Sequence, residues 1–145
     1  MFGVAGLRYV VWLEGINDLG ACLVSGDDVI NGFKDVVGRL HAKNIKVIGA
    51  TLPSSFGSPI GSYGFPKVDT ERKKVNDFIR TSRLFDAVAD MDAATLDPAT
   101  GAMKAPMQPN QTTGGPGELL HPNRVGYQAM AETIDLKAMA PSPHE

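Results

Sequence analysis

The chain has 145 residues, of which 43% are hydrophobic and 21% are charged, and its formal net charge is −2 at pH 7. This length favours a single domain with its own core, and no stretch approaches the roughly 20 consecutive apolar residues of a membrane-spanning helix. The 14 basic residues are scattered, which argues against a nucleic-acid partner and favours a small molecule or a protein.

The first two predicted elements are a strand and an amphipathic helix. The apolar run Tyr9–Leu13 lacks polar alternation, which is typical of a parallel strand covered on both faces, and we expect it to be a central strand. The helix is predicted to begin at a capping box formed by Ser25 and Asp28 and to end near Lys43 or Asn44. Its apolar stripe consists of Val29, Ile30, Phe33, Val36, Val37 and Leu40.

A second strand and a long loop follow. Ile45–Thr51 is predicted to be a buried strand that Leu52 and Pro53 end at once. The segment 54–67 is rich in Gly, Ser and Pro and has no hydrophobic period. Because long loops inside compact domains are more often functional than idle, we expect this segment to contribute to a site.

The next helix is predicted to start from a cap at Asp69 or Thr70 and to extend to about Arg80. Its narrow apolar face contains Val75, Phe78 and Ile79. The charge run Glu71–Lys74 is expected to form a solvated face of this helix, without a catalytic part.

Three further features complete the chain. Phe85–Met91 is predicted to be a third short strand, and 97–117 a long irregular connection. The last helix is expected to begin at Asn123, and the tail 141–143 to fray. The inward residues of that helix are predicted to be Val125, Met130 and Ile134.

The alternation of strands and helices predicts a parallel sheet in a three-layer α/β/α sandwich, as one domain over residues 1–145. In such sheets the chemistry lies beyond the carboxyl ends of the strands. This rule selects 14–19, 52–63 and 91–94, and the segment 118–123 can close over the same edge. Asp90 and Asp92 either line this cleft or act as helix caps.

Two segments at this edge contain residues suited to acyl chemistry. Gly15 permits a tight turn, and Asn17 can direct an amide donor at a developing oxyanion, although such a turn is also common for structural reasons. Glu118 lies three residues before His121 on a segment stiffened by Pro122, so it can bond the imidazole and fix which nitrogen acts as the base. A loop histidine taken alone is more often a solvated surface group.

Both segments resemble motifs of the GDSL/SGNH hydrolase family. VVWLEGIND, residues 10–18, is similar to block III, and LLHPNRVGYQAMAETI, residues 119–134, is similar to block V. The resemblance covers nearly the whole chain. It implies a flavodoxin-like fold, hydrolysis of carboxylic esters through an acyl-enzyme without a cofactor, Asn17 as the oxyanion donor and His121 as the general base.

The chain departs from the family pattern in two ways. The family's Gly-Asp-Ser block I, which bears the nucleophile, and its block II glycine lie upstream of block III, whereas only seven residues precede Arg8. The resemblance therefore implies an N-terminally truncated domain. The family's catalytic aspartate is replaced by Glu118, whose extra methylene still lets it orient His121.

The departures leave two hypotheses open. The first is an esterase or lipase-like hydrolase of a small-molecule ester. Such an enzyme needs a nucleophilic serine, supplied either by a missing part of the domain or by another serine of this chain. Ser54, Ser55, Ser58 and Ser62 lie in the rim loop, although turn chemistry explains them as well. The second is a noncatalytic truncated domain. In both, loss of the family's first strand makes 8–14 an edge, which predicts a homo-oligomer formed through that edge.

Other chemistries have little support in the sequence. Cys22 is the only cysteine, and His41, His121 and His144 do not recur at metal-ligand spacing. Trp12 is expected to belong to the core. The N-terminus lacks the pattern of a signal peptide, and full-length relatives are often secreted, so the compartment is left open.

Overall fold

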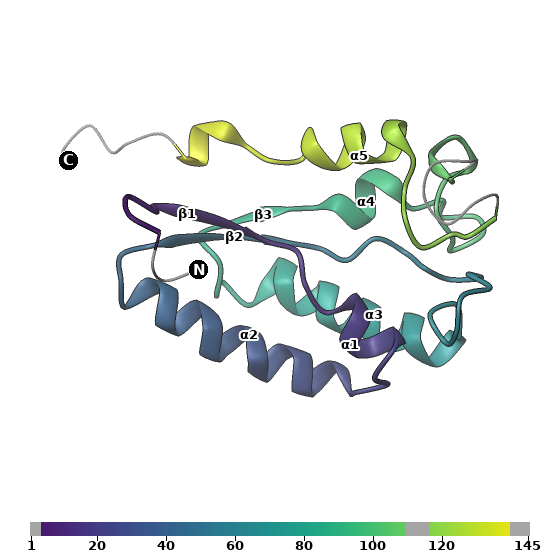
Figure 1. The fold of residues 1–145 in the computed structure, drawn as a ribbon, viewed down its shortest axis with the longest axis horizontal. Helices are drawn as coiled ribbons and strands as arrows, with labels where there is room; N and C mark the ends of the chain where they lie inside the picture. Colours follow the sequence, from purple (N-terminus) through teal and green to yellow (C-terminus); the bar gives the residue numbers. More distant parts are fainter. Residues whose placement is uncertain (1–3, 110–116, 140–145) are drawn as a thin grey trace.

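The computed structural model describes residues 4–109 and 117–139. Its centre is a three-stranded parallel sheet with the order β1-β2-β3 (Figure 1). The strands are β1 (Tyr9–Trp12), β2 (Lys46–Ala50) and β3 (Ala87–Ala89). Val11 pairs with Ile48, and Gly49 pairs with Val88. The three predicted strands are therefore present, and all of them run in parallel.

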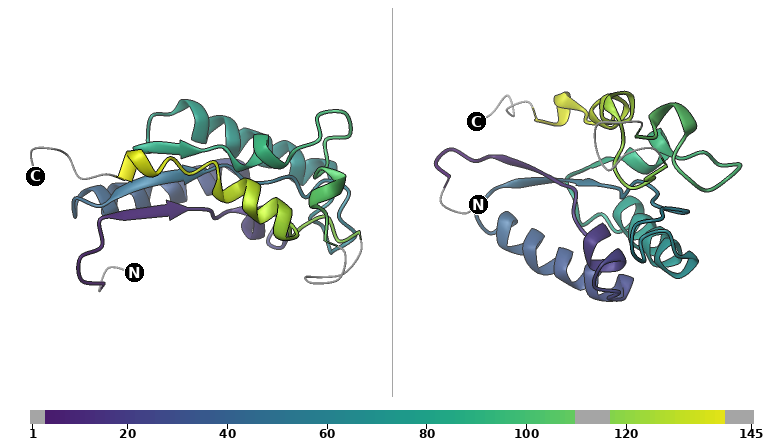
Figure 2. Two further views of the ribbon diagram at one scale, coloured as in Figure 1. Left: turned by 90° about the horizontal axis from the view of Figure 1, so that it is seen from above. Right: turned by 45° about the vertical axis from the view of Figure 1, so that its right-hand side comes forward.

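Helices lie on both sides of this sheet (Figures 1 and 2). Below it in Figure 1 are α1 (Ile16–Gly20), α2 (Gly26–His41) and α3 (Pro66–Thr81). Above it are α4 (Met91–Thr95), α5 (Arg124–Ala131) and the 3₁₀ helix η2 (Leu136–Met139), while the 3₁₀ helix η1 (Ala105–Met107) lies near the start of α5. Within the described ranges no helix is long and apolar enough to cross a bilayer.

The core consists of one hydrophobic cluster on each face of the sheet. Val47 belongs to the larger cluster, with Leu40 of α2 and Val75 of α3. Its neighbour Ile48 belongs to the smaller cluster, with Met130 of α5. Successive side chains of a strand point to opposite faces, so the unbroken apolar sequence of β2 follows from burial on both sides.

The first strand is an edge strand rather than a central one. Among the described residues only β2 pairs with β1, and Val11 is 38% exposed. The prediction of a central strand covered on both faces is therefore wrong for these residues. An apolar run indicates a hydrophobic environment but not the number of neighbouring strands. The position of β1 agrees instead with the expectation that residues 8–14 form an edge.

The start of α2 agrees with the predicted capping box. The Ser25 hydroxyl accepts a hydrogen bond from the Asp28 backbone N–H at 3.2 Å, and the Ser25 N–H donates to the Asp28 carboxylate at 3.3 Å. We expect Ser25→Ala to lower the free energy of unfolding by about 1 kcal/mol, whereas Ser25→Gly costs only a few tenths. Urea denaturation measures both, and equal losses would contradict a capping role.

The second long helix begins a turn earlier than predicted. Pro66 is its first residue, because a proline at this position has a suitable φ and lacks an N–H that would be unpaired there anyway. Asp69, the predicted cap, is instead a buried residue of the first turn. The apolar face agrees with the prediction at Val75 and Ile79, which are fully buried, and Phe78 is half-buried.

The last helix begins after Asn123, as predicted, and this side chain accepts from two backbone N–H groups. Met130 is buried and Ile134 packs beside it, but Val125 is 54% exposed, so its predicted inward orientation is wrong. Gly126, four residues before Met130, is buried instead, and a Cβ there would lie only 2.5 Å from Cβ of Pro122. Residues 110–116, which belong to the 97–117 connection, lie outside the described residues, and so does the tail 141–143.

Candidate active site

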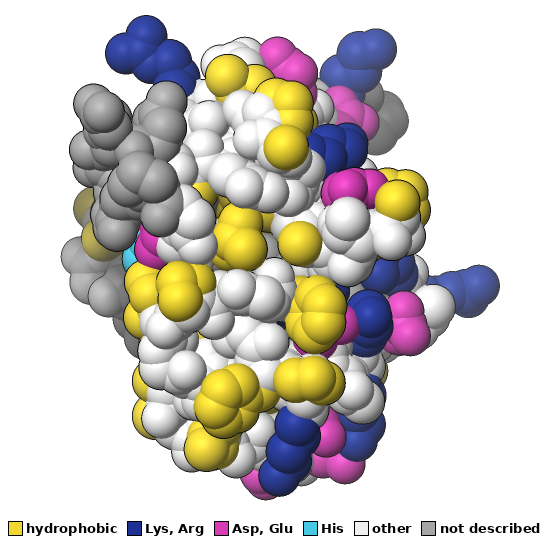
Figure 3. Space-filling view, turned by 90° about the vertical axis from the view of Figure 1, so that its right-hand side faces the viewer, with side chains coloured by type: hydrophobic (Ala, Val, Ile, Leu, Met, Phe, Trp, Pro, Cys, Tyr) yellow, Lys and Arg dark blue, Asp and Glu magenta, His cyan; other side chains and the backbone are white. Residues whose placement is uncertain are grey.

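The chain segments that leave β1 and β2 meet the approach to α5 at a pocket of about 180 Å³. Asn17 and His121 both line it, as do Leu52 and Pro53. Figure 3 faces this end of the molecule, where hydrophobic side chains are interspersed with polar ones and most charged groups lie toward the rim. The structure therefore brings together the two segments that the sequence singled out.

Gly15 forms the turn that presents Asn17. Its φ of 117° lies in the left-handed region, and a Cβ at this position would be 3.0 Å from a Val29 methyl group. Only glycine meets both requirements without strain. Asn17 follows in the first turn of α1, and its Oδ1 accepts a hydrogen bond from the Tyr63 hydroxyl at 2.8 Å.

Glu118 and His121 form a close pair. The distance from Oε1 of Glu118 to Nδ1 of His121 is 2.5 Å, and the His121 backbone N–H also donates to Oε2 at 3.3 Å. The carboxylate side chain is 1% exposed and the imidazole is 50% exposed. Nδ1–H therefore donates to the buried carboxylate, which leaves Nε2 as the basic nitrogen. Glu118, one methylene longer than the aspartate that the resemblance implies at this position, therefore reaches the imidazole.

Leu119 lies between these two residues and has a φ of 55°. Non-glycine residues rarely adopt this conformation, and they cluster at functional sites, where the surrounding structure enforces them. Here it accompanies a sharp turn of the chain that lets Glu118 reach back to His121.

None of the four loop serines lines the pocket with His121. Ser54, Ser55 and Ser58 are buried and Ser62 is half-buried. Each hydroxyl donates to a backbone carbonyl, in turn those of Gly101, Tyr63, Glu118 and Gly20. Among the described residues the structure therefore brings no serine hydroxyl to the base, and it gives these four serines the turn and packing roles that the sequence left open.

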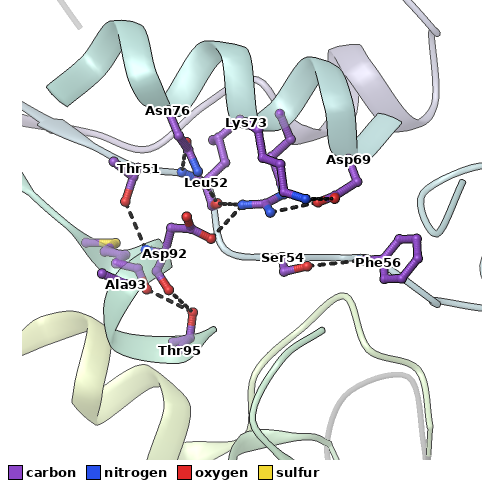
Figure 4. Close-up of polar contacts among 12 residues, drawn as sticks. Thr51, Leu52, Ser54, Phe56, Asp69, Lys73, Asn76, Asp92, Ala93 and Thr95 are labelled. Carbon is purple, nitrogen blue, oxygen red and sulfur yellow. Dashed lines mark hydrogen bonds and ion pairs between the residues drawn. The ribbon is translucent and has the colours of Figure 1, made fainter. Parts of the chain in front are cut away.

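A buried polar network bonds the backbone of Leu52, a residue that lines the pocket (Figure 4). Arg72 of α3 is fully buried and donates to Asp69 at 2.7 Å, to Asp92 at 2.5 Å and to the Leu52 carbonyl at 2.9 Å. Asn76 bonds both the N–H and the carbonyl of Leu52. The prediction of a solvated face for Glu71–Lys74 is therefore wrong at Arg72, which fixes the backbone of a pocket residue.

Asp90 and Asp92 take capping and ion-pair roles rather than lining the pocket. Asp90 caps α4 by accepting from the Ala93 N–H, and it also accepts from Arg80 at 2.7 Å. The hydrogen bond from Arg80 is the main cause that lowers the pKa of Asp90 to about 2. Asp92 lies between Arg72 and Arg80.

The lowered pKa of Asp90 predicts a loss of stability in acid. The folded-state pKa of Asp90 lies below the ordinary value of 3.8, so its carboxylate stabilises the folded state fully above pH 3.8. This stabilisation is lost as the pH falls toward 2. We expect the urea midpoint to fall between about pH 5 and pH 2.5, and to fall less in Asp90→Asn. An equal fall in both proteins would contradict this assignment.

The sequence did not identify Tyr63 or Tyr127 as site residues. Tyr63 bonds Asn17, and Tyr127 of α5 lines the pocket. For Tyr63 the only available signal was an aromatic residue inside a segment already expected to lie at this edge, and Tyr127 lies outside the segments expected there. Such a signal does not select a partner, since the Tyr63–Asn17 contact joins residues 46 positions apart.

Comparison with known proteins shows the family of the chain. No curated protein matches the chain. The model of the GDSL-like Lipase/Acylhydrolase family matches residues 3–129, a range that includes the Asn17 turn, the Glu118–His121 pair and all three strands. Because this match spans most of the sequence, the chain belongs to the GDSL-like Lipase/Acylhydrolase family.

Proposed function

We propose that this chain carries the general base, the orienting acid and the oxyanion donor of a carboxylic-ester hydrolase of the esterase or lipase-like type. The proposal depends on one observation: His121, held through Nδ1 by a buried Glu118, lines the same pocket as Asn17. Membership of a lipase and acylhydrolase family supports hydrolysis as the reaction class.

The proposed chemistry assigns one step to each side chain. Nε2 of His121 takes the proton of an attacking hydroxyl, and the amide of Asn17 donates to the oxygen of the ester carbonyl as it becomes negative. His121 then gives the proton to the departing alcohol. Glu118 holds the ring in place and stabilises the imidazolium that forms. With a serine hydroxyl the product of this step is an acyl-enzyme, which water cleaves in the same manner.

The lining of the pocket favours a short, apolar acyl group. Leu13, Leu52, Leu120 and Met130 contribute to the lining. The volume of about 180 Å³ is below the roughly 300–1,000 Å³ of pockets that hold drug-sized ligands. A short-chain ester is therefore the substrate class of choice for a first assay.

We further propose that the chain is part of a three-layer SGNH domain whose nucleophile comes from outside these 145 residues. Among the residues that the structure describes, only β2 pairs with β1, so a further strand can add at the other side of β1. The engagement of all four loop serines with backbone carbonyls disfavours a replacement nucleophile among them.

The test is hydrolysis of a short-chain nitrophenyl ester together with labelling by a fluorophosphonate. The chain alone should hydrolyse the ester slowly, because His121 can activate water directly. Asn17→Ala should lower this rate by about 10²-fold, the effect of losing an oxyanion donor. Asn44→Ala, at the opposite end of the sheet, is the control. If peptide mapping finds the label on a loop serine, the proposal that the nucleophile comes from outside these residues is wrong.

The second candidate is a noncatalytic domain that self-associates, and the exposed edge of β1 favours it. Val11 and Leu13 are each 38% exposed beside this edge, so a second copy can cover apolar surface there while it adds a strand next to β1. Sedimentation should then show a tight dimer, together with no ester hydrolysis. A stable monomer at tens of micromolar would count against self-association.

A further inference from the structure

The orientation of the Asn17 amide decides whether this residue can stabilise an oxyanion. A side-chain amide has an acceptor, Oδ1, and a donor group, Nδ2. An oxyanion is stabilised when Nδ2 faces it and is repelled when Oδ1 does. Asn17 lies in an exposed turn, so packing alone does not select one orientation. A hydrogen-bond partner has to do so.

We propose that Tyr63 is this partner, a positioning residue that directs Nδ2 of Asn17 toward the substrate carbonyl. The inference rests on the proposed function and deepens it. The Tyr63 hydroxyl donates to Oδ1 at 2.8 Å, which directs Nδ2 away from Tyr63. Within residues 4–109 and 117–139 no protein acceptor bonds Nδ2. The amide donor is therefore free for a ligand.

Tyr63 is itself fixed against α1. Its ring packs on Gly20, where a Cβ would lie 2.2 Å from a ring carbon, so only glycine leaves room for it. The neighbouring Ser62 hydroxyl donates to the Gly20 carbonyl. The Ser55 hydroxyl donates to the Tyr63 carbonyl at 2.9 Å. These contacts place the Tyr63 hydroxyl before any substrate binds, so the amide is oriented in advance.

The same loop also holds the acid–base segment. The Ser58 hydroxyl donates to the Glu118 carbonyl at 2.5 Å, and a Cβ on Gly57 would lie 3.6 Å from Leu119. Loop 54–65 therefore contacts both Asn17 and the turn that bears His121, although these lie in distant parts of the sequence. It sets the position of the oxyanion donor relative to the base.

Tyr63→Phe tests the inference because it keeps the ring on Gly20 and removes only the hydroxyl. We expect kcat for a short-chain nitrophenyl ester to fall about tenfold with KM unchanged, since one hydrogen bond no longer selects the amide orientation. Tyr9→Phe, at the far end of β1, should keep the parent kcat. A parent-like kcat in Tyr63→Phe would overturn the positioning role.

A double-mutant cycle separates positioning from a general structural effect. If Tyr63 acts through the amide, Tyr63→Phe should have no further effect on kcat in an Asn17→Ala background. A similar fall in both backgrounds would overturn the inference, because it would show that Tyr63 acts on the fold instead.

A readout that does not depend on activity distinguishes failure of this inference from failure of the proposed function. In ¹⁵N spectra the side-chain NH₂ signals of Asn17 should shift and broaden in Tyr63→Phe. Those of Asn123, whose Nδ2 donates to the carbonyls of Pro106 and Gln108, should not change. Absence of hydrolysis by the parent would remove the proposed function while these signals still report the Tyr63–Asn17 bond. Unaltered Asn17 signals would overturn the inference alone.

Discussion

Replacing Arg72 by methionine is expected to lower the free energy of unfolding by about 3–5 kcal/mol, the usual cost of breaking a buried ion pair from one side. Arg72 is fully buried, and the side chains of Asp69 and Asp92 are 9% and 6% exposed. The variant leaves both carboxylates with reduced compensation in a poorly solvated site. It also removes a donor to the Leu52 carbonyl, which is buried.

Urea denaturation at neutral pH measures this loss. Lys73→Met is the matched control, because Lys73 also pairs with Asp69, at 2.7 Å, but its side chain is 58% exposed. Because the ammonium group of Lys73 lies in solvent and Arg72 still compensates Asp69, we expect Lys73→Met to cost about 0–1 kcal/mol. A loss below about 1 kcal/mol in Arg72→Met would show that the network is not a major source of stability.

The burial of Arg72 agrees with helical periodicity but could not be predicted from it. Val68, Arg72, Val75 and Ile79 follow the spacing of one helix face, and all four are buried. The charge run that includes Arg72 was nevertheless predicted to be solvated, because charged residues are rarely buried without partners. Its partner Asp92 comes from α4, a helix that the sequence did not predict. The prediction failed because the compensating charge is not local.

Local sequence signals predicted where helices begin better than they predicted which strands lie side by side. The capping box at Ser25 and the cap at Asn123 depend on side chains within three residues, and both are present. The position of β1 at the edge depends on which strands surround it, and its apolar sequence is the same in either case. The rule that chemistry lies beyond the carboxyl ends of parallel strands selected the segment 14–19, and 118–123 was expected to close over the same edge. Asn17 and His121, from these two segments, line one pocket.

The loop serines show the limit of that rule. They lie in the segment after β2 where the sequence placed them, but each hydroxyl is directed by a backbone carbonyl elsewhere in the fold. The Tyr63 hydroxyl is likewise directed by an acceptor distant in the sequence, Oδ1 of Asn17. Sequence patterns locate segments at an edge of the sheet, whereas the direction of each side chain depends on acceptors that only the folded chain brings near.

Replacing His121 by alanine is expected to reduce ester hydrolysis by at least about 10²-fold, because a positioned general base contributes about 10²–10⁴-fold. Glu118→Gln should also reduce the rate, since the amide cannot stabilise the imidazolium as a carboxylate does. Its effect should not exceed that of His121→Ala. In the double variant the two losses should not add, because Glu118 acts only through the imidazole.

His41→Ala is the matched control for this experiment. His41 also pairs with a carboxylate, with 2.9 Å between its Nε2 and Oδ2 of Asp86, but it lies at the end of α2 and does not line the pocket of Asn17. If any histidine–carboxylate pair on the surface could hydrolyse an activated ester, both alanine variants would lose rate equally. That result would contradict the assignment of His121, whereas a loss confined to His121→Ala would tie hydrolysis to the pocket shared with Asn17.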